Sequence, residues 1–163
     1  MANDGSDTTP WLTPQERRAW LSIAALIVKL PNALDAQLQS DSGIGFFDYM
    51  VLAVLSEEPR RTLQLSDIAA ATSASLSRLS HTVTRLERQG LVRRERIPGP
   101  GRRTNAVLTD EGYAKVVAAA PAHVRRVRDL VIDALTPTQL RTLGTVGARV
   151  IERIDPGRSC SDD

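Results

Sequence analysis

Hydroxyl and basic side chains recur within residues 75–89 at spacings that a helix would bring to one side. They belong to Ser75, Ser77, Arg78, His81, Thr82 and Arg85. Residues three and four apart are neighbours on a helix surface. Short hydroxyl side chains let a helix approach a nucleic acid closely, and arginine reaches base acceptors or phosphate oxygens. The segment is therefore typical of a helix that enters the major groove of double-stranded DNA.

Within this set, we expect Arg78 and His81 to contact base edges, because they lie three residues apart on the outward face. Arg85, further along the same face, is expected to bind a phosphate. An ordinary surface role for His81 stays open. Metal ligation by His81 is not expected, since the only other histidine is His123 and the sequence contains a single cysteine.

Positive charge is concentrated in residues 78–103. Eight arginines fall in this segment against only Glu87 and Glu95, whereas the whole chain has a net charge of +2. Such an uneven distribution predicts a surface that binds a polyanion. Arg102 and Arg103 follow a Pro-Gly-Pro-Gly turn at the expected tip of a β-hairpin. There they are expected to follow the DNA backbone or to enter a minor groove.

Helix-capping patterns predict the elements that must position these side chains. Thr13, followed by Pro14 and Glu16, begins a long helix with an apolar stripe, which is expected to kink at Pro31. The middle of the chain predicts an apolar helix over 46–58, a short helix capped by Ser66, and the helix over 75–89, capped by Ser75. An alternating pattern then predicts strands at 91–97 and 104–108. Two further helices are expected, one over 109–134 that is capped by Thr109 and one over 136–154 that begins with the capping pattern from Thr136 to Gln139.

Three short helices followed by a hairpin predict a winged helix-turn-helix, in which the third helix reads DNA. The inner face of this third helix, over 75–89, is expected to pack on the two helices before it through Leu76, Leu79, Val83 and Leu86. The predicted fold class is mainly α with a small β-hairpin wing, plus N- and C-terminal dimerisation helices. The expected organisation is a flexible arm over 1–12, an N-terminal dimerisation helix over 13–40, the DNA-binding lobe over 46–110, C-terminal dimerisation helices over 111–154 and a flexible tail over 155–163.

The helices at the two ends carry apolar residues with no expected partner in their own chain. Those of the C-terminal helices are Val116, Val117, Val124, Val127, Leu130, Val131, Leu135, Leu140, Leu143, Val146, Val150 and Ile151. A second copy of the chain would bury them. A two-fold dimer places two reading helices in successive major grooves, so the expected DNA partner is an inverted repeat.

Several motifs, in order over about residues 14–153, resemble the multiple antibiotic resistance regulator (MarR) family of bacterial transcription factors. They are Leu65-Ser66-Asp67-Ile68-Ala69, the helix from Leu76 to Leu86, the run from Arg85 to Val92, and Arg102-Arg103 followed by the run from Val107 to Gly112. The resemblance implies a homodimeric winged-helix repressor, with any ligand pocket between the dimer region and the DNA-binding lobe. The family wing usually has Asp-x-Arg; here Gly101 stands at the Asp position, so Arg103 lacks that partner.

Other classes of function find less support in the sequence. No Ser/His/Asp order, metal constellation or phosphate-binding loop is present, so neither an enzyme nor a cofactor is expected. Cys160 lies in an acidic tail, which disfavours a redox role. The longest apolar run, residues 23–28, is much shorter than the roughly 20 residues that a bilayer requires, and no signal peptide is evident, so a cytoplasmic protein without membrane contact is expected.

Two alternatives remain. Aromatic residues either line a pocket for a small aromatic or other organic effector, or pack in the core or at an interface; they are Trp11, Trp20, Phe46, Phe47 and Tyr49. The whole chain is either a DNA-binding regulator or a dimeric helical protein-interaction module without specific DNA binding. A salt-sensitive affinity for duplex DNA distinguishes these two functions.

Overall fold

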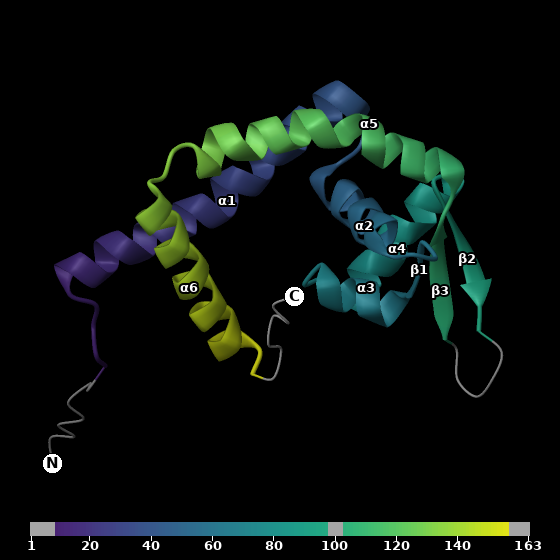
Figure 1. The fold of residues 1–163 in the computed structure, drawn as a ribbon. Coiled ribbons are helices and arrows are strands. Elements are labelled where there is room, and N and C mark those ends of the chain that lie inside the picture. The colour runs from purple at the N-terminus through teal and green to yellow at the C-terminus, as the bar shows by residue number, and fades with distance from the viewer. Residues whose placement is uncertain (1–8, 98–102, 157–163) are drawn as a thin grey trace, which may run out of the picture. The chain divides into compact units, whose positions relative to one another are not determined.

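The computed structural model describes residues 9–97 and 103–156 (Figure 1). Three residues of interest in the sequence lie outside the described residues, namely Gly101, Arg102 and Cys160. The chain divides into two compact units, residues 1–33 and 34–163, and the first helix crosses the boundary between them. The predicted fold class is confirmed: the protein is mostly helical with a small antiparallel sheet.

Three helices form the centre of the second unit: α2 (Phe46–Glu57), α3 (Leu65–Ala71) and α4 (Leu76–Arg88). Their core positions are filled by large aliphatic side chains that are fully buried, namely Leu52, Leu55, Ile68, Leu79, Val83 and Leu86. Burial of each such side chain stabilises the fold by about 1.5–3 kcal/mol. This core holds α4 by one face and leaves its other face open.

The turn between α3 and α4 sets the start of α4. Ser73 has a φ of 51°, a left-handed conformation that the chain needs in order to turn between the two helices. Ser75 then caps α4 as predicted, because its Oγ accepts a hydrogen bond from the Arg78 N–H at 3.2 Å. The predicted cap of α3 is wrong: Gln64 precedes the helix, and the Ser66 hydroxyl instead donates to the Asp67 carboxylate.

The wing is part of a three-stranded sheet and not an isolated hairpin. Strands β2 (Val92–Arg96) and β3 (Thr104–Leu108) pair as predicted, and a short strand β1 (Thr62–Gln64) adds to the other side of β3. All pairs are antiparallel, with β3 in the middle. In Figure 1, β2 and β3 are the two long arrows beside α3 and α4. Both strands of the wing thus contact the helical core, β2 through α4 and β3 through α2 and α3.

Helix α5 (Asp110–Val127) begins at Thr109, whose Oγ1 accepts from the Gly112 N–H at 3.0 Å. It does not continue to residue 134 as expected, because a π-helical segment follows at Arg128–Ile132. Helix α6 (Pro137–Ile154) has the predicted capping box between Thr136 and Gln139. No residue of α6 is buried within its own chain.

Helix α1 (Pro14–Ser42) has the predicted cap, with the Thr13 N–H donating to the Glu16 carboxylate at 2.7 Å, and it continues through Pro31. Its apolar stripe is divided: Leu34 and Leu38 are buried, whereas side chains nearer its start are exposed, including Trp20, Ile23 and Ile27. By length and composition α1 could cross a membrane, although core helices of soluble proteins pass the same test.

The unpartnered apolar surface is smaller than expected, because Val116 is buried and five further side chains are half-buried in their own chain, namely Val127, Leu130, Val131, Leu135 and Leu140. Val116 is 6% exposed and belongs to the core of its own chain. The exposed apolar side chains of α5 and α6 include Val117, Val124, Leu143, Val146, Val150 and Ile151. Val116 lies near the start of α5, where that helix packs on α2, so its side chain turns inward.

Candidate nucleic-acid interface

Helix α4 exposes most of the predicted reading residues. The exposed side chains are those of Ser75, Ser77, Arg78, His81 and Arg85, together with Arg88, which was not among the predicted contacts. A helix brings every third or fourth residue to the same side, and Arg88 follows His81 by seven residues, so both lie on the open face.

Two residues of α4 face the other way from what the sequence predicted. Thr82 is only 4% exposed, and it lies beside Leu79 and Leu86 because it is three residues from one and four from the other. Thr82 therefore does not belong to the open face. Leu76, expected in the core, is 55% exposed. It lies in the first turn of α4 and borders a cleft toward β3 that also touches Ser80.

The two arginines on the α2 side of α4 are held by residues of α2. The guanidinium carbon of Arg78 lies 4.2 Å from the centroid of the Phe47 ring, a cation–π contact. Arg85 forms an ion pair with Asp48, whose side chain is 7% exposed. Asp48 also accepts from the Gly45 N–H at 3.3 Å. The direction of each arginine is thus set by a partner in α2.

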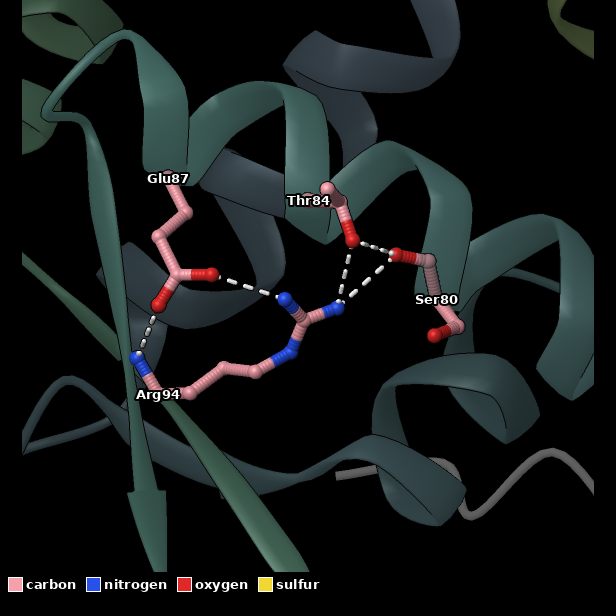
Figure 2. A network of polar contacts seen from close by, with 4 residues as sticks. All are labelled: Ser80, Thr84, Glu87 and Arg94. Carbon is pink, nitrogen blue, oxygen red and sulfur yellow. Dashed lines mark hydrogen bonds and ion pairs between the residues drawn. The ribbon is translucent and has the colours of Figure 1, made fainter.

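Ion pairs inside the chain neutralise part of the arginine cluster. Besides the Arg85–Asp48 pair, Arg93 pairs with Glu95 and Arg94 pairs with Glu87 (Figure 2). Among the described residues, four arginines of the cluster have no acidic partner within ion-pair distance, namely Arg78, Arg88, Arg96 and Arg103. The positive charge that is open to a polyanion is therefore smaller than the sequence suggests, and it lies on α4 and the wing.

Arg103 is exposed just before β3. It borders, with Ser80 and Leu76, a cleft of about 310 Å³ that lies between the starts of α3 and α4 and the wing. Its backbone oxygen accepts from the Ile97 N–H at 3.1 Å, which continues the β2–β3 pairing by one more bond. The side chain thus extends from an ordered part of the wing, at the same end as the start of α4.

A second cleft, of about 410 Å³, borders the start of α2 and the side of α4. Its lining includes Asp35, Gln39, Phe47, Asp48 and Arg85. The partners of the two held arginines, Phe47 and Asp48, are thus both walls of this cleft. Of the aromatic residues considered for a pocket, Phe47 is in this lining, whereas Trp11 and Trp20 are exposed.

The remaining aromatic residues pack against a buried histidine. The ring centroid of His123 lies 4.4 Å from that of Tyr49 and 5.9 Å from that of Phe46. His123 is 9% exposed, and its Nδ1 has no hydrogen-bond partner within the described part of the chain. Burial disfavours the imidazolium and lowers the pKa of His123 below its ordinary value of 6.5. No group of acidic, histidine or cysteine side chains suited to a metal occurs in residues 9–97 and 103–156.

His123 should make stability depend on pH. Because its pKa is lower in the folded chain than in the unfolded chain, the unfolded state takes up a proton first as the pH falls below 6.5. The free energy of unfolding should therefore decrease from pH 7 downward until the folded-state pKa is passed. A His123→Phe variant should lack this component, which chemical denaturation at pH 7.0, 6.0 and 5.5 would measure. Parallel pH curves for the two proteins would contradict the expectation.

Comparison with known proteins identifies a family. Residues 42–103 match the model of the MarR family. The chain is 43% identical to Sco3205 of Streptomyces coelicolor, a MarR family transcriptional regulator solved in complex with DNA, with a TM-score of 0.87 over 90% of this chain and 96% of that one. It is 38% identical to AbsC, a MarR family regulator of the same organism, with a TM-score of 0.84 over 90% and 98% of the two chains. Among curated proteins no match was found.

Proposed function

The chain belongs to the MarR family of transcriptional regulators, and on that basis we propose that it is a sequence-specific, double-stranded DNA-binding regulator that acts as a homodimer in the cytoplasm. The observation that carries the proposal is the open face of α4, where Ser77, His81 and Arg88 are exposed beside a basic wing. A helix about 10 Å across fills a major groove about 12 Å wide.

The proposed contacts follow from the positions of the side chains. Ser75 caps α4, and Ser77, Arg78 and His81 lie in its first half, the part of a reading helix that meets base edges. Arg85 and Arg88 are proposed to bind phosphates. Arg103, together with Arg102 from outside the described residues, is proposed to bind the backbone or the minor groove. The burial of Thr82 removes it from the proposed contacts.

The homodimer is proposed because exposed apolar side chains occur on α1 and along α6. Burial between two copies would remove them from water and, by two-fold symmetry, present two α4 helices to successive major grooves. The expected operator is an inverted repeat with half-site centres about 10 base pairs apart.

A repressor released by a small organic ligand is the proposed mode of regulation. The cleft of about 410 Å³ beside α2 supports it, because its walls include the residues that hold Arg78 and Arg85. An aromatic acid bound there would stack on Phe47 and compete with Asp48 for the Arg85 guanidinium. Such a ligand would redirect two side chains of the reading helix and so weaken binding to the operator.

In vitro selection from a random duplex library tests the proposed function. The expected outcome is an enriched inverted repeat whose affinity for the protein falls with salt. Enriched sites without two-fold symmetry would contradict the proposal that a symmetric dimer places two α4 helices in successive major grooves. A protein without salt-sensitive affinity for any duplex would favour the alternative, a dimeric helical protein-interaction module that binds through its exposed apolar faces.

Arg78→Ala should weaken binding to the selected operator by about 1–3 kcal/mol and relax the preference at one base pair in each half-site. Affinity for random DNA should change little, because a base contact contributes nothing there. Fluorescence anisotropy with operator and random duplexes measures both. An equal loss on the two duplexes would show that Arg78 binds phosphate.

A further inference from the structure

Arg94 is the most fully engaged side chain of the wing. From β2 it donates Nη1–H to the Glu87 Oε2 at 2.7 Å, and it donates from Nη2 to the Ser80 backbone oxygen and the Thr84 Oγ1, both at 2.9 Å (Figure 2). Its backbone N–H donates to the other oxygen of Glu87 at 3.1 Å. The three partners all belong to α4.

These hydrogen bonds fix β2 against α4 in more than one direction. The acceptors at residues 80, 84 and 87 extend over about two turns of α4. The guanidinium group is planar and rigid, so bonds to both of its terminal nitrogens fix an orientation as well as a distance. Because β2 pairs with β3 from Val92 to Arg96, an anchored β2 also places β3 and the adjoining Arg103.

The same contacts set Arg94 apart from arginines that are open to DNA. Its side chain is 26% exposed, and Glu87 neutralises its charge. Arg96, two residues along β2, is exposed and has no acidic partner within ion-pair distance in the described ranges. The sequence counts both as equal members of a basic cluster, whereas the structure gives them different surroundings.

We propose that Arg94 is a positioning residue that fixes the wing relative to α4 and thereby sets the spacing between the base contacts of the helix and the DNA contacts of the wing. The proposal rests on the proposed function for its effect on DNA, while the anchoring itself is a property of the free protein. A wing held at the wrong angle would misplace one set of contacts in each half-site.

Arg94→Lys tests the proposal, because lysine keeps the charge but lacks the fork. A misplaced contact is comparable with one mismatched base pair, so affinity for the selected operator should fall about tenfold. Affinity for random DNA and the slope of log affinity against log salt should stay near wild type. Binding is measured well below the unfolding temperature, so that reduced stability alone does not change the result. Wild-type operator affinity in Arg94→Lys would overturn the proposal.

Arg96→Met serves as the matched reference for a charge contact on the same strand. If Arg96 binds phosphate, loss of two arginines per dimer makes the salt slope shallower by about 2, on operator and random DNA alike. The same signature in Arg94→Met, which removes the charge, would show that Arg94 itself binds DNA and would overturn the positioning role. If the Arg94 variants fold poorly, Glu87→Gln provides a milder test. Its affinity for the operator should decrease by less than that of Arg94→Lys, and its affinity for random DNA should not change.

A measurement without DNA separates this proposal from the proposed function. Spin labels at Ser77→Cys on α4 and Arg96→Cys on β2, in a Cys160→Ser chain diluted with unlabelled protein, report the distance between helix and wing. The distance distribution should be narrow with Arg94 and broader with Arg94→Lys. An unchanged distribution would overturn the anchoring, even if the protein binds its operator. A broader one supports the anchoring even if no operator is found.

Discussion

Gly112→Ala should destabilise the folded chain by about 3 kcal/mol, because a methyl group at this position has no space. Its Cβ would lie 2.1 Å from the Leu91 backbone oxygen and 2.7 Å from the Leu108 Cδ1. The Leu91 oxygen cannot move away freely, since it accepts a hydrogen bond from the Thr109 N–H at 3.1 Å. Gly112 thus lets the start of α5 lie directly against Leu91, just before β2, and Leu108, at the end of β3.

Urea denaturation at a fixed protein concentration measures the loss of stability in Gly112→Ala. Glu111→Ala is the matched control: it introduces alanine in the same helical turn at an exposed position, and it should cost less than about 1 kcal/mol through the helix dipole. Equal effects of the two substitutions would show that the backbone around Leu91 adjusts to the extra methyl group, and that the close approach is not required.

A double substitution on α6, Leu143→Glu with Val150→Glu, should convert the dimer to a folded monomer. The two side chains are 42% and 49% exposed and lie seven residues apart, on one side of the helix. Four carboxylates per dimer would have to be buried without partners, which costs far more than the apolar burial gains. Sedimentation should then show a monomer, and circular dichroism should show unchanged helix content, since α6 contributes no buried residue to its own chain.

The same variant should bind the inverted repeat at least a hundredfold more weakly, because two unlinked half-site contacts lose their mutual effective concentration. Thr145→Glu with Ala148→Glu is the matched control. It adds the same charges to the opposite side of α6, where both positions are exposed, and it should keep the dimer and most of the affinity. If the control dissociates as well, charge repulsion and not the apolar face accounts for the loss.

Local sequence signals predicted the beginnings of most helices. Thr13, Ser75, Thr109 and Thr136 each cap the helix expected after them, because an N-cap depends only on residues within one turn. The face of α4 was predicted less well. Leu79, Val83 and Leu86 form the core stripe of α4, and either Leu76 or Thr82 could join them at helical spacing. Leu76 was chosen as the fourth member because it is the more hydrophobic of the two. The structure buries Thr82 instead, since only contacts with other elements decide where a stripe ends.

Features that depend on distant parts of the chain were not predictable from the sequence. Strand β1 has three residues and exists through its pairing with β3, more than forty positions later. The network of Arg94 joins a strand to a backbone oxygen and two side chains of a helix, and no spacing rule identifies such partners. The positions of single arginines in the proposed interface follow from these contacts and not from local pattern.

The internal pairing of Arg85, Arg93 and Arg94 has a consequence for how such a protein would find one operator in a genome. Attraction to random DNA comes almost entirely from unpaired cations, whereas discrimination between sequences needs groups held in fixed directions. Pairing of arginines with acidic partners lowers the attraction to random DNA while it preserves the discrimination between sequences. The protein would then leave incorrect sites quickly, so its search would proceed by frequent dissociation and rebinding more than by long sliding along the duplex.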